Sequence, residues 1–84
     1  MTKREYLESI GYDYYDITGY HKIIKFTNSE FYIHAYIFPN YITHNPEYIF
    51  CLEPTLIKTQ KDIDNLQIAF NNVRRDYEEM QKYA

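Results

Sequence analysis

The sequence has few of the residues that cross-link small extracellular domains or build nucleotide-binding loops. Its 84 residues include one cysteine, two glycines, three prolines and no tryptophan. The single thiol, Cys51, excludes an internal disulfide, although a secreted chain of this size usually carries several. We therefore expect a cytoplasmic protein that folds without disulfides.

Long apolar runs are missing as well. No segment approaches the roughly 18 apolar residues that a membrane-spanning helix requires. Residues 1–10 are polar and charged and lack the apolar core of a secretory signal peptide. Both features predict a chain that is neither secreted nor inserted into a membrane.

Positive charge is also scarce. Lysine and arginine total 9 against 12 aspartates and glutamates, so the formal net charge is -3. Domains that bind nucleic acids are usually strongly basic, because lysine and arginine neutralise phosphates. The charge therefore argues against direct nucleic-acid binding.

Motifs for catalysis and metal binding are absent too. There is no Gly-rich phosphate loop and no GxSxG nucleophile elbow. Cys51 is predicted on a strand, without the helix N-terminus or adjacent cation that would activate its thiolate. His21, His34, His44 and Cys51 are residue types that bind zinc, but no CxxC or HxxxH spacing fixes a geometry. We expect no enzyme activity, no cofactor and no metal site, and we interpret the histidines as solvent-facing.

The chain is instead rich in aromatic residues, with 11 tyrosines and 5 phenylalanines. We expect residues 1–84 to form a single compact α+β domain, and a domain of this size buries only about 60 to 65% of its unfolded surface. Each aromatic side chain can bury about 150 to 250 Å². Because so small a core cannot hold every tyrosine, several must lie at the surface.

Two helices are predicted, one near each end of the chain. Thr2 and Glu5 form a capping box before a short helix that Gly11 ends. The second helix is predicted over residues 59–84, with Thr59 as its N-cap. Apolar side chains at alternating steps of three and four form one stripe along it. That stripe consists of Ile63, Leu66, Phe70, Val73, Tyr77 and Met80.

The stripe has two interpretations. It can cover a sheet within the same molecule, or it can form the a and d seam of a dimeric coiled coil. Phe70 and Tyr77 fit two-stranded seams poorly, and the predicted sheet needs a cover. We therefore favour the intramolecular interpretation.

Three strands are predicted between the helices. Residues 17–27 and 31–38 are rich in β-branched and aromatic residues, with the turn formers Asn28 and Ser29 between them. Residues 48–53 form a third strand, and residues 12–16 form a loop or the start of a strand. We expect an α-β-β-β-α order, in which the long C-terminal helix covers one face of a three-stranded antiparallel sheet.

The register of the first hairpin sorts its side chains onto two faces. With Thr27 and Glu30 closing the turn, one face is apolar apart from a lysine. It pairs Phe26 with Phe31, Ile24 with Ile33, Lys22 with Ala35 and Tyr20 with Ile37. The other face pairs Lys25 with Tyr32, Ile23 with His34 and His21 with Tyr36. A shift by one residue would mix the two sets, so this sorting supports the register.

The candidate binding residues lie on that second face and in the segment before the hairpin. Tyrosine is favoured at protein interfaces, because it offers a large contact area and a hydroxyl group with few torsions to freeze. We expect the partner-binding residues to be Asp13, Tyr14, Tyr15, Asp16, His21, Tyr32, His34 and Tyr36. The alternative is that several of these tyrosines lie flat on the edge of the core.

In size, mild acidity and element order, the chain resembles small phage-encoded inhibitors, among them some anti-CRISPR proteins that block the DNA-binding channels of CRISPR nucleases. The resemblance covers no motif. It implies that a monomer or homodimer binds another protein, such as a nucleic-acid-processing enzyme. We therefore expect a small protein-binding module that acts as an inhibitor or adaptor.

The element order also resembles that of double-stranded-RNA-binding domains, so a nucleic-acid-binding or regulatory module is the alternative. The basic cluster at the start of that family's last helix would fall at residues 59–62, where Lys61 is followed by Asp62. A shared order of elements does not carry function. A third hypothesis is a subunit of a larger enzyme.

Overall fold

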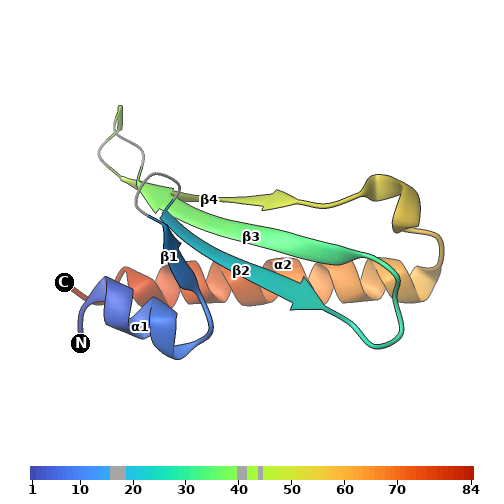
Figure 1. Ribbon diagram of the computed structural model, residues 1–84, viewed down its shortest axis with the longest axis horizontal. Coiled ribbons are helices and arrows are strands. Elements are labelled where there is room, and N and C mark those ends of the chain that lie inside the picture. The colour runs from blue at the N-terminus through green and yellow to red at the C-terminus, as the bar shows by residue number, and fades with distance from the viewer. Residues whose placement is uncertain (16–18, 40–41, 44) are drawn as a thin grey trace.

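The computed structural model describes residues 1–15, 19–39, 42–43 and 45–84. These residues form an α+β fold, in which Figure 1 shows a long C-terminal helix lying along one face of a sheet. A short N-terminal helix lies at the end of the molecule that carries both termini. The elements are α1 (Lys3–Ser9), β1 (Asp13–Tyr15), β2 (Gly19–Lys25), β3 (Tyr32–Pro39), β4 (Pro46–Cys51), the 3-10 helix η1 (Pro54–Leu56) and α2 (Gln60–Met80).

The sheet is antiparallel, with four strands in the order β1-β2-β3-β4. The fold class and the C-terminal helix are as predicted, but the expectation of three strands is wrong. The additional strand is β1, in the segment expected as a loop or the start of a strand. All three of its residues are exposed, so its sequence shows no alternation of buried and exposed positions. The strand is defined by its backbone pairing with β2.

The hairpin of β2 and β3 has the predicted register. Every predicted ladder pair is present, from Lys25 opposite Tyr32 to Tyr20 opposite Ile37, and the rings of Phe26 and Phe31 meet beyond the ladder. We call the side of the sheet that faces α2 the inner face. Its central residues on β3 are fully buried, and β4 continues it with partly buried aromatic residues. These residues are Ile33, Ala35 and Ile37 on β3, and Tyr48 and Phe50 on β4.

Both helices begin with the predicted caps. In each, a threonine and the acid three residues later form a capping box, Thr2 with Glu5 in α1 and Thr59 with Asp62 in α2. Such a box satisfies two backbone N–H groups that have no partner within the helix. The start of each helix is therefore set by local sequence.

The end of α2 differs from the prediction. The helix stops at Met80 and does not continue to Ala84. The residues beyond it turn toward α1, where the ring of Tyr83 stacks on that of Tyr6 with 5.0 Å between centroids. The backbone N–H of Lys3 donates to the carbonyl of Ala84 at 3.3 Å. The two ends of the described chain are thus in contact.

The buried stripe of α2 is rotated relative to the predicted one. Val73 and Met80 are buried as predicted, whereas Ile63 is half exposed. The other predicted stripe residues are partly buried on its flank, where they pack against the core; these are Leu66, Phe70 and Tyr77. The fully buried line includes three polar residues and consists of Asp62, Asn65, Ala69, Val73, Asp76 and Met80. Hydrophobicity alone misplaces the stripe, because hydrogen bonds stabilise its polar members.

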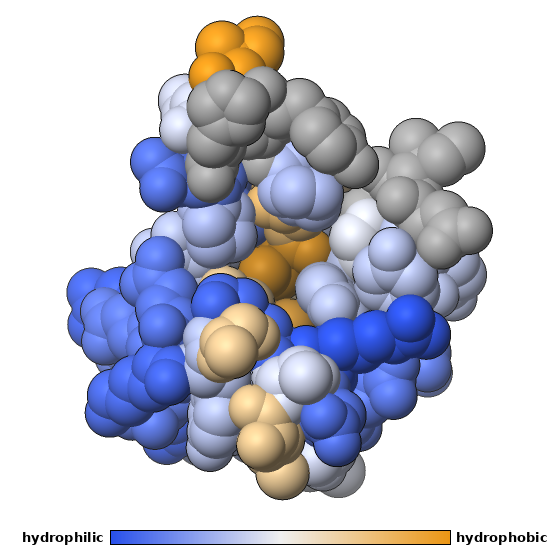
Figure 2. Space-filling view, turned by 90° about the vertical axis from the view of Figure 1, so that its left-hand side faces the viewer, coloured by the Kyte–Doolittle hydropathy of each residue, from blue (hydrophilic) through white to orange (hydrophobic). Residues whose placement is uncertain are grey.

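The core has two clusters between α2 and the inner face. One joins Phe31 and Ile33 to Ala69, and the other joins Leu7 and Tyr12 to the inner face and the end of α2. Figure 2 views the end of the molecule that carries the termini, where apolar side chains gather in a central hollow and most of the surrounding surface is hydrophilic. Helix α2 thus packs its buried side chains against the sheet and α1 of the same chain. No helix of the described residues is long and apolar enough to cross a membrane.

Candidate functional site

The sheet turns its second side away from α2, and we call this side the outer face. By strand alternation it carries Asp13, Tyr15, His21, Ile23, Lys25, Tyr32, His34, Tyr36, Phe38, Glu47, Ile49 and Cys51. Four large side chains spread over all four strands are about half exposed there. Their exposed fractions are 45% for Ile23, 46% for Tyr32, 48% for Ile49 and 51% for Tyr15. The described part of the chain thus leaves this side of the sheet accessible.

Five rings of the outer face form a connected group, which we call the ring array. It consists of Tyr15, His21, Tyr32, His34 and Tyr36. The ring of His21 lies 4.8 Å from Tyr36 and 6.1 Å from Tyr15, measured between centroids. The ring of His34 meets Tyr32 edge-on at 5.3 Å. Because the array spans the paired strands β1, β2 and β3, the backbone ladder holds its rings in place.

Two histidines of the array, His21 and His34, are in direct contact. His21 Nε2 and His34 Nδ1 are 2.8 Å apart, within hydrogen-bond distance, and the two rings stack with an interplanar angle of 18°. The pKa of His21 is lowered, chiefly by partial burial and then by the neighbouring His34, while the carboxylate of Asp13 acts in the opposite direction. Near neutral pH His21 is therefore biased toward its uncharged form.

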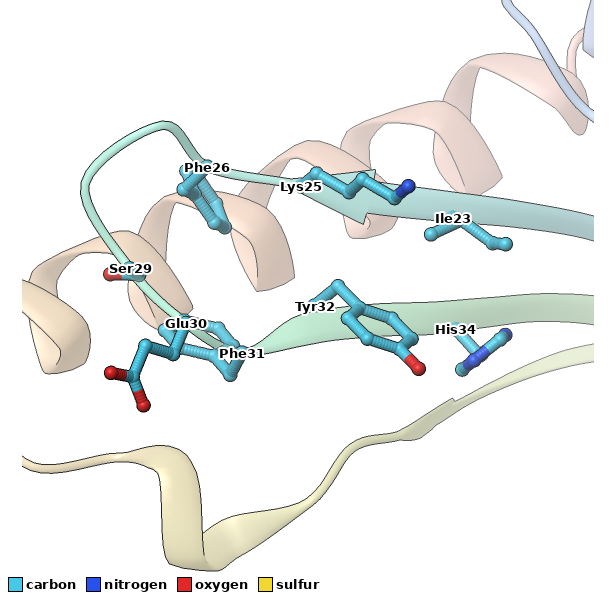
Figure 3. Close-up of a pocket in the computed structure, with 8 residues that line it drawn as sticks. All are labelled: Ile23, Lys25, Phe26, Ser29, Glu30, Phe31, Tyr32 and His34. Atoms are coloured by element: carbon cyan, nitrogen blue, oxygen red, sulfur yellow. The ribbon is translucent and has the colours of Figure 1, made fainter.

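Two hollows flank the side chains of Tyr32 and His34. The first, of about 410 Å³, lies toward the hairpin turn and is shown in Figure 3. In that view Tyr32 and His34 follow β3, while Lys25 and Ile23 lie across from them on β2. The second hollow, of about 430 Å³, lies toward β4 and η1 and is also lined by Cys51 and Leu56. Tyr32 thus stands between two depressions that a partner side chain can enter.

The hairpin turn beside the first hollow is tied to the start of α2. The hydroxyl of Ser29 donates to Asp62 Oδ1 at 2.5 Å, and Asn65 Nδ2 donates to Asn28 Oδ1 at 2.8 Å. The pKa of Asp62 is lowered to about 2, because Ser29 and then the backbone N–H of Lys58 donate to its carboxylate. This network fixes the turn and with it the end of β3 that carries Tyr32.

Five of the predicted binding residues form the ring array, namely Tyr15, His21, Tyr32, His34 and Tyr36. A sixth, Asp13, lies at the edge of the array, opposite His21 in the ladder of β1 and β2. Tyr14 lies on the inner side, where its ring contacts Tyr20 at 5.1 Å and the guanidinium of Arg4 at 4.3 Å. Asp16 and His44 lie outside the described residues.

Sequence reasoning did not select the apolar members of the outer face. Ile49 and Cys51 point outward because Tyr48 and Phe50, which alternate with them along β4, point inward. The alternation of the third strand was the available signal, since it assigns the intervening residues to the opposite face. Cys51 is exposed and lies opposite His34. Among the described residues, no three His, Cys, Asp or Glu side chains are placed to hold a metal ion.

Comparisons of the chain with family models, with curated proteins and with solved structures give no match.

Proposed function

We propose that this chain is a small protein-binding module, which acts as an inhibitor of or adaptor for a partner protein by occupying its surface. The observation that carries this proposal is the ring array on the accessible side of a sheet whose other side is packed against α2. Large side chains with no core to fill are characteristic of interaction surfaces.

The physical properties of the array suit an anchor for protein contacts. Tyrosine rings bring contact area and a hydroxyl group while losing few torsions on binding. Here neighbouring rings and the strand ladder already restrict them, so less conformational entropy remains to be lost. The half-exposed Ile23 and Ile49 extend the apolar area on either side of the array. A partner would bury the rings at its centre and fill the hollows beside Tyr32.

The partner that we propose is a nucleic-acid-processing enzyme. Such enzymes carry basic channels that attract acidic proteins, and this chain has a net charge of -3. Its outer face carries two carboxylates, Asp13 and Glu47, and one lysine, Lys25. The resemblance in size and acidity to phage-encoded inhibitors supports the same choice.

A second candidate is binding of single-stranded nucleic acid, which one observation favours. Proteins of that kind stack bases on aromatic rings exposed on an antiparallel sheet, and the ring array presents such rings. However, phosphate binding needs cations along the strand, and Lys25 is the only lysine or arginine on the outer face as defined by the described residues. The protein-binding proposal therefore ranks first.

The test of the proposal compares two double variants in capture from a bacterial lysate, followed by mass spectrometry. Tyr32→Ser with Tyr36→Ser removes two rings of the array. Ile63→Ser with Ile68→Ser is the matched control, because both isoleucines are half exposed on α2. We expect a protein that the wild type retains to bind the first variant at least about tenfold more weakly, a loss of about 1.4 kcal/mol, and the control normally.

Two results would contradict the proposal. If the wild type retains no protein, the chain does not act by binding a partner protein. If the tyrosine variant retains the partner as well as the control does, recognition does not use the ring array. Melting curves of both variants accompany the capture experiment. The tyrosines point away from the core, so we expect the first variant to melt close to the wild type.

A further inference from the structure

The two histidines at the centre of the ring array share one hydrogen bond, which makes the array sensitive to protons. His21 Nε2 and His34 Nδ1 are 2.8 Å apart, and their rings stack with 5.1 Å between centroids. We infer that this pair is a pH-dependent switch, which holds the ring array together at neutral pH and opens it when both rings are protonated. The inference rests on the proposed function, because it describes regulation of the same surface.

The geometry of the bond allows the pair to gain one proton but not two. In the neutral pair, one nitrogen donates and the other accepts. One added proton gives an imidazolium that still donates to its neutral neighbour, and the charge strengthens the bond. A second proton leaves both nitrogens as donors with no acceptor between them. Two positive rings then lie in contact, so the second protonation must break the bond and separate the rings.

The groups that face the pair come from every strand of the sheet. On β1, Asp13 lies opposite His21, and its negative charge favours the first proton. On β2, Lys25 lines the first hollow together with His34 and adds positive charge, and Glu30 of the hairpin turn lines the same hollow. Glu53, after β4, lines the second hollow with His34. The remaining neighbours are Tyr15 on β1, Tyr32 and Tyr36 on β3, and Cys51 on β4. Asp13 is the carboxylate that raises the pKa of His21, while Glu30 and Glu53 line the two hollows beside His34. The second proton is therefore opposed by the geometry of the bond, which then has two donors and no acceptor, and not by a shortage of carboxylates.

Separation of the rings would change the whole array, because His34 is its central member. The ring of His34 contacts His21, Tyr32 and Tyr36, with centroid distances of 5.1, 5.3 and 6.5 Å. When His34 moves away from His21, the rings that pack on it must shift too. The pKa of His21 is already lowered by burial and by His34, which agrees with a pair that resists full protonation.

An NMR titration of the full chain tests the switch without a partner. We follow the imidazole signals of His21 and His34 and the ring signals of Tyr32 and Tyr36 from about pH 8.5 to about pH 4.5. We expect two protonation steps more than about one pH unit apart, and a shift of the tyrosine signals at the lower step. H21Q has no second imidazole in the pair, so in this variant we expect the two-step behaviour to be lost.

Tyr83 is the internal control, because its ring stacks on Tyr6 away from the array and should not respond to the lower step. Two results would overturn the inference. One is independent single-step titration of His21 and His34 in the wild type, with the signals of His34 following the same curve in H21Q. The other is a lower step that leaves the signals of Tyr32 and Tyr36 in place.

A failed switch and a failed function give different results. If the lysate experiment yields no partner but the NMR titration shows two coupled steps, the proposed function is wrong and the switch stands. If a partner is retained but both histidines titrate independently, the function stands and the switch is wrong. A partner that the wild type binds at neutral pH and releases at about pH 5, together with two coupled steps in the titration, supports both.

Discussion

Three buried polar side chains of α2 have hydrogen-bond partners outside the helix. Asp62 accepts from Ser29, Asn65 donates to Asn28, and Asp76 accepts from the hydroxyl of Tyr12. A buried polar group without a partner would cost about 1 to 3 kcal/mol of folding free energy. These hydrogen bonds offset that cost for the three polar residues in the buried line of α2. They also decide which way α2 is rotated on the sheet. The partners lie far away in the chain, so no local pattern in the sequence could have revealed them.

Asp62→Asn tests the carboxylate at the start of α2. Its pKa is lowered to about 2 by donation from Ser29 and from the backbone of Lys58 and Thr59. An unfolded aspartate has a pKa of about 3.9, so the charged group stabilises the fold above that pH, and this contribution is lost as the pH falls toward the folded value. D62N should be less stable than the wild type at neutral pH, and the difference should shrink between about pH 4 and about pH 2.

Urea unfolding at several pH values measures this difference. Asp64→Asn is the control, because Asp64 lies in the same turn and its one hydrogen bond within the described part of the chain is a surface bond accepted from Gln60 at 3.0 Å. D64N should unfold at nearly the wild-type urea concentration at every pH. A stability gap between D62N and the wild type that stays constant down to the lowest pH would show that the carboxylate does not supply this stabilisation.

Helix α2 owes part of its position to large side chains on one flank of its buried line. The ring of Phe70 stacks on Phe50 at 4.3 Å, and two turns later the hydroxyl of Tyr77 donates to the carbonyl of Pro46 at 2.7 Å. This flank therefore binds β4, the edge strand of the sheet. This contact fixes β4 beside β3 and completes the outer face around Cys51 and Ile49.

Phe70→Ala should destabilise the fold strongly. Its ring packs against Phe50 and the cluster of Phe31, Ile33 and Ala69, and truncation of such a ring costs about 3 to 5 kcal/mol. A chain of this size has a total stability of about 4 to 12 kcal/mol, so cooperative melting should be shifted far down or lost. Thermal melting followed by circular dichroism measures the effect.

Ile63→Ala and Gln67→Ala are the controls for this prediction. Both residues are exposed on α2, so truncation should cost well under about 1 kcal/mol. The comparison separates the observed rotation of the helix from the one predicted by hydrophobicity, in which Ile63 is a core residue. A loss from Ile63→Ala as large as that from Phe70→Ala would favour the predicted rotation.

The elements differ in how well sequence patterns predict them. The hairpin register followed from strict alternation, since a slip of one residue would bury Lys25 and expose Ile24. The same alternation put Tyr32 and Tyr36 on the outer face. It could not predict the bond between His21 and His34, because a diagonal pair meets only if both side chains adopt suitable rotamers. β1 was missed because its pairing depends on backbone groups.

At the scale of the molecule, the described residues form a two-layer arrangement that covers one side of the sheet. Both helices contribute to the core on the inner face, and the described residues add no third layer over the outer face. Charge then decides which class of partner can approach this surface, because acidic and basic surfaces attract each other over about one Debye length, roughly 8 to 10 Å in physiological salt.

The net charge of -3 predicts weak or no binding to nucleic acid. Fluorescence anisotropy with random single-stranded DNA, single-stranded RNA and duplex DNA measures this directly. At about 150 mM salt we expect no binding at micromolar protein concentrations, because few phosphates can be neutralised. A micromolar Kd that weakens steeply with added salt would reverse the ranking of the two proposed functions.

In that event, two variants should both weaken the binding of nucleic acid. Lys25→Glu should do so with a reduced salt dependence, and the double change of Tyr32 and Tyr36 to serine should do so through lost base stacking. Binding that neither variant changes would instead place the nucleic-acid contact away from the outer face.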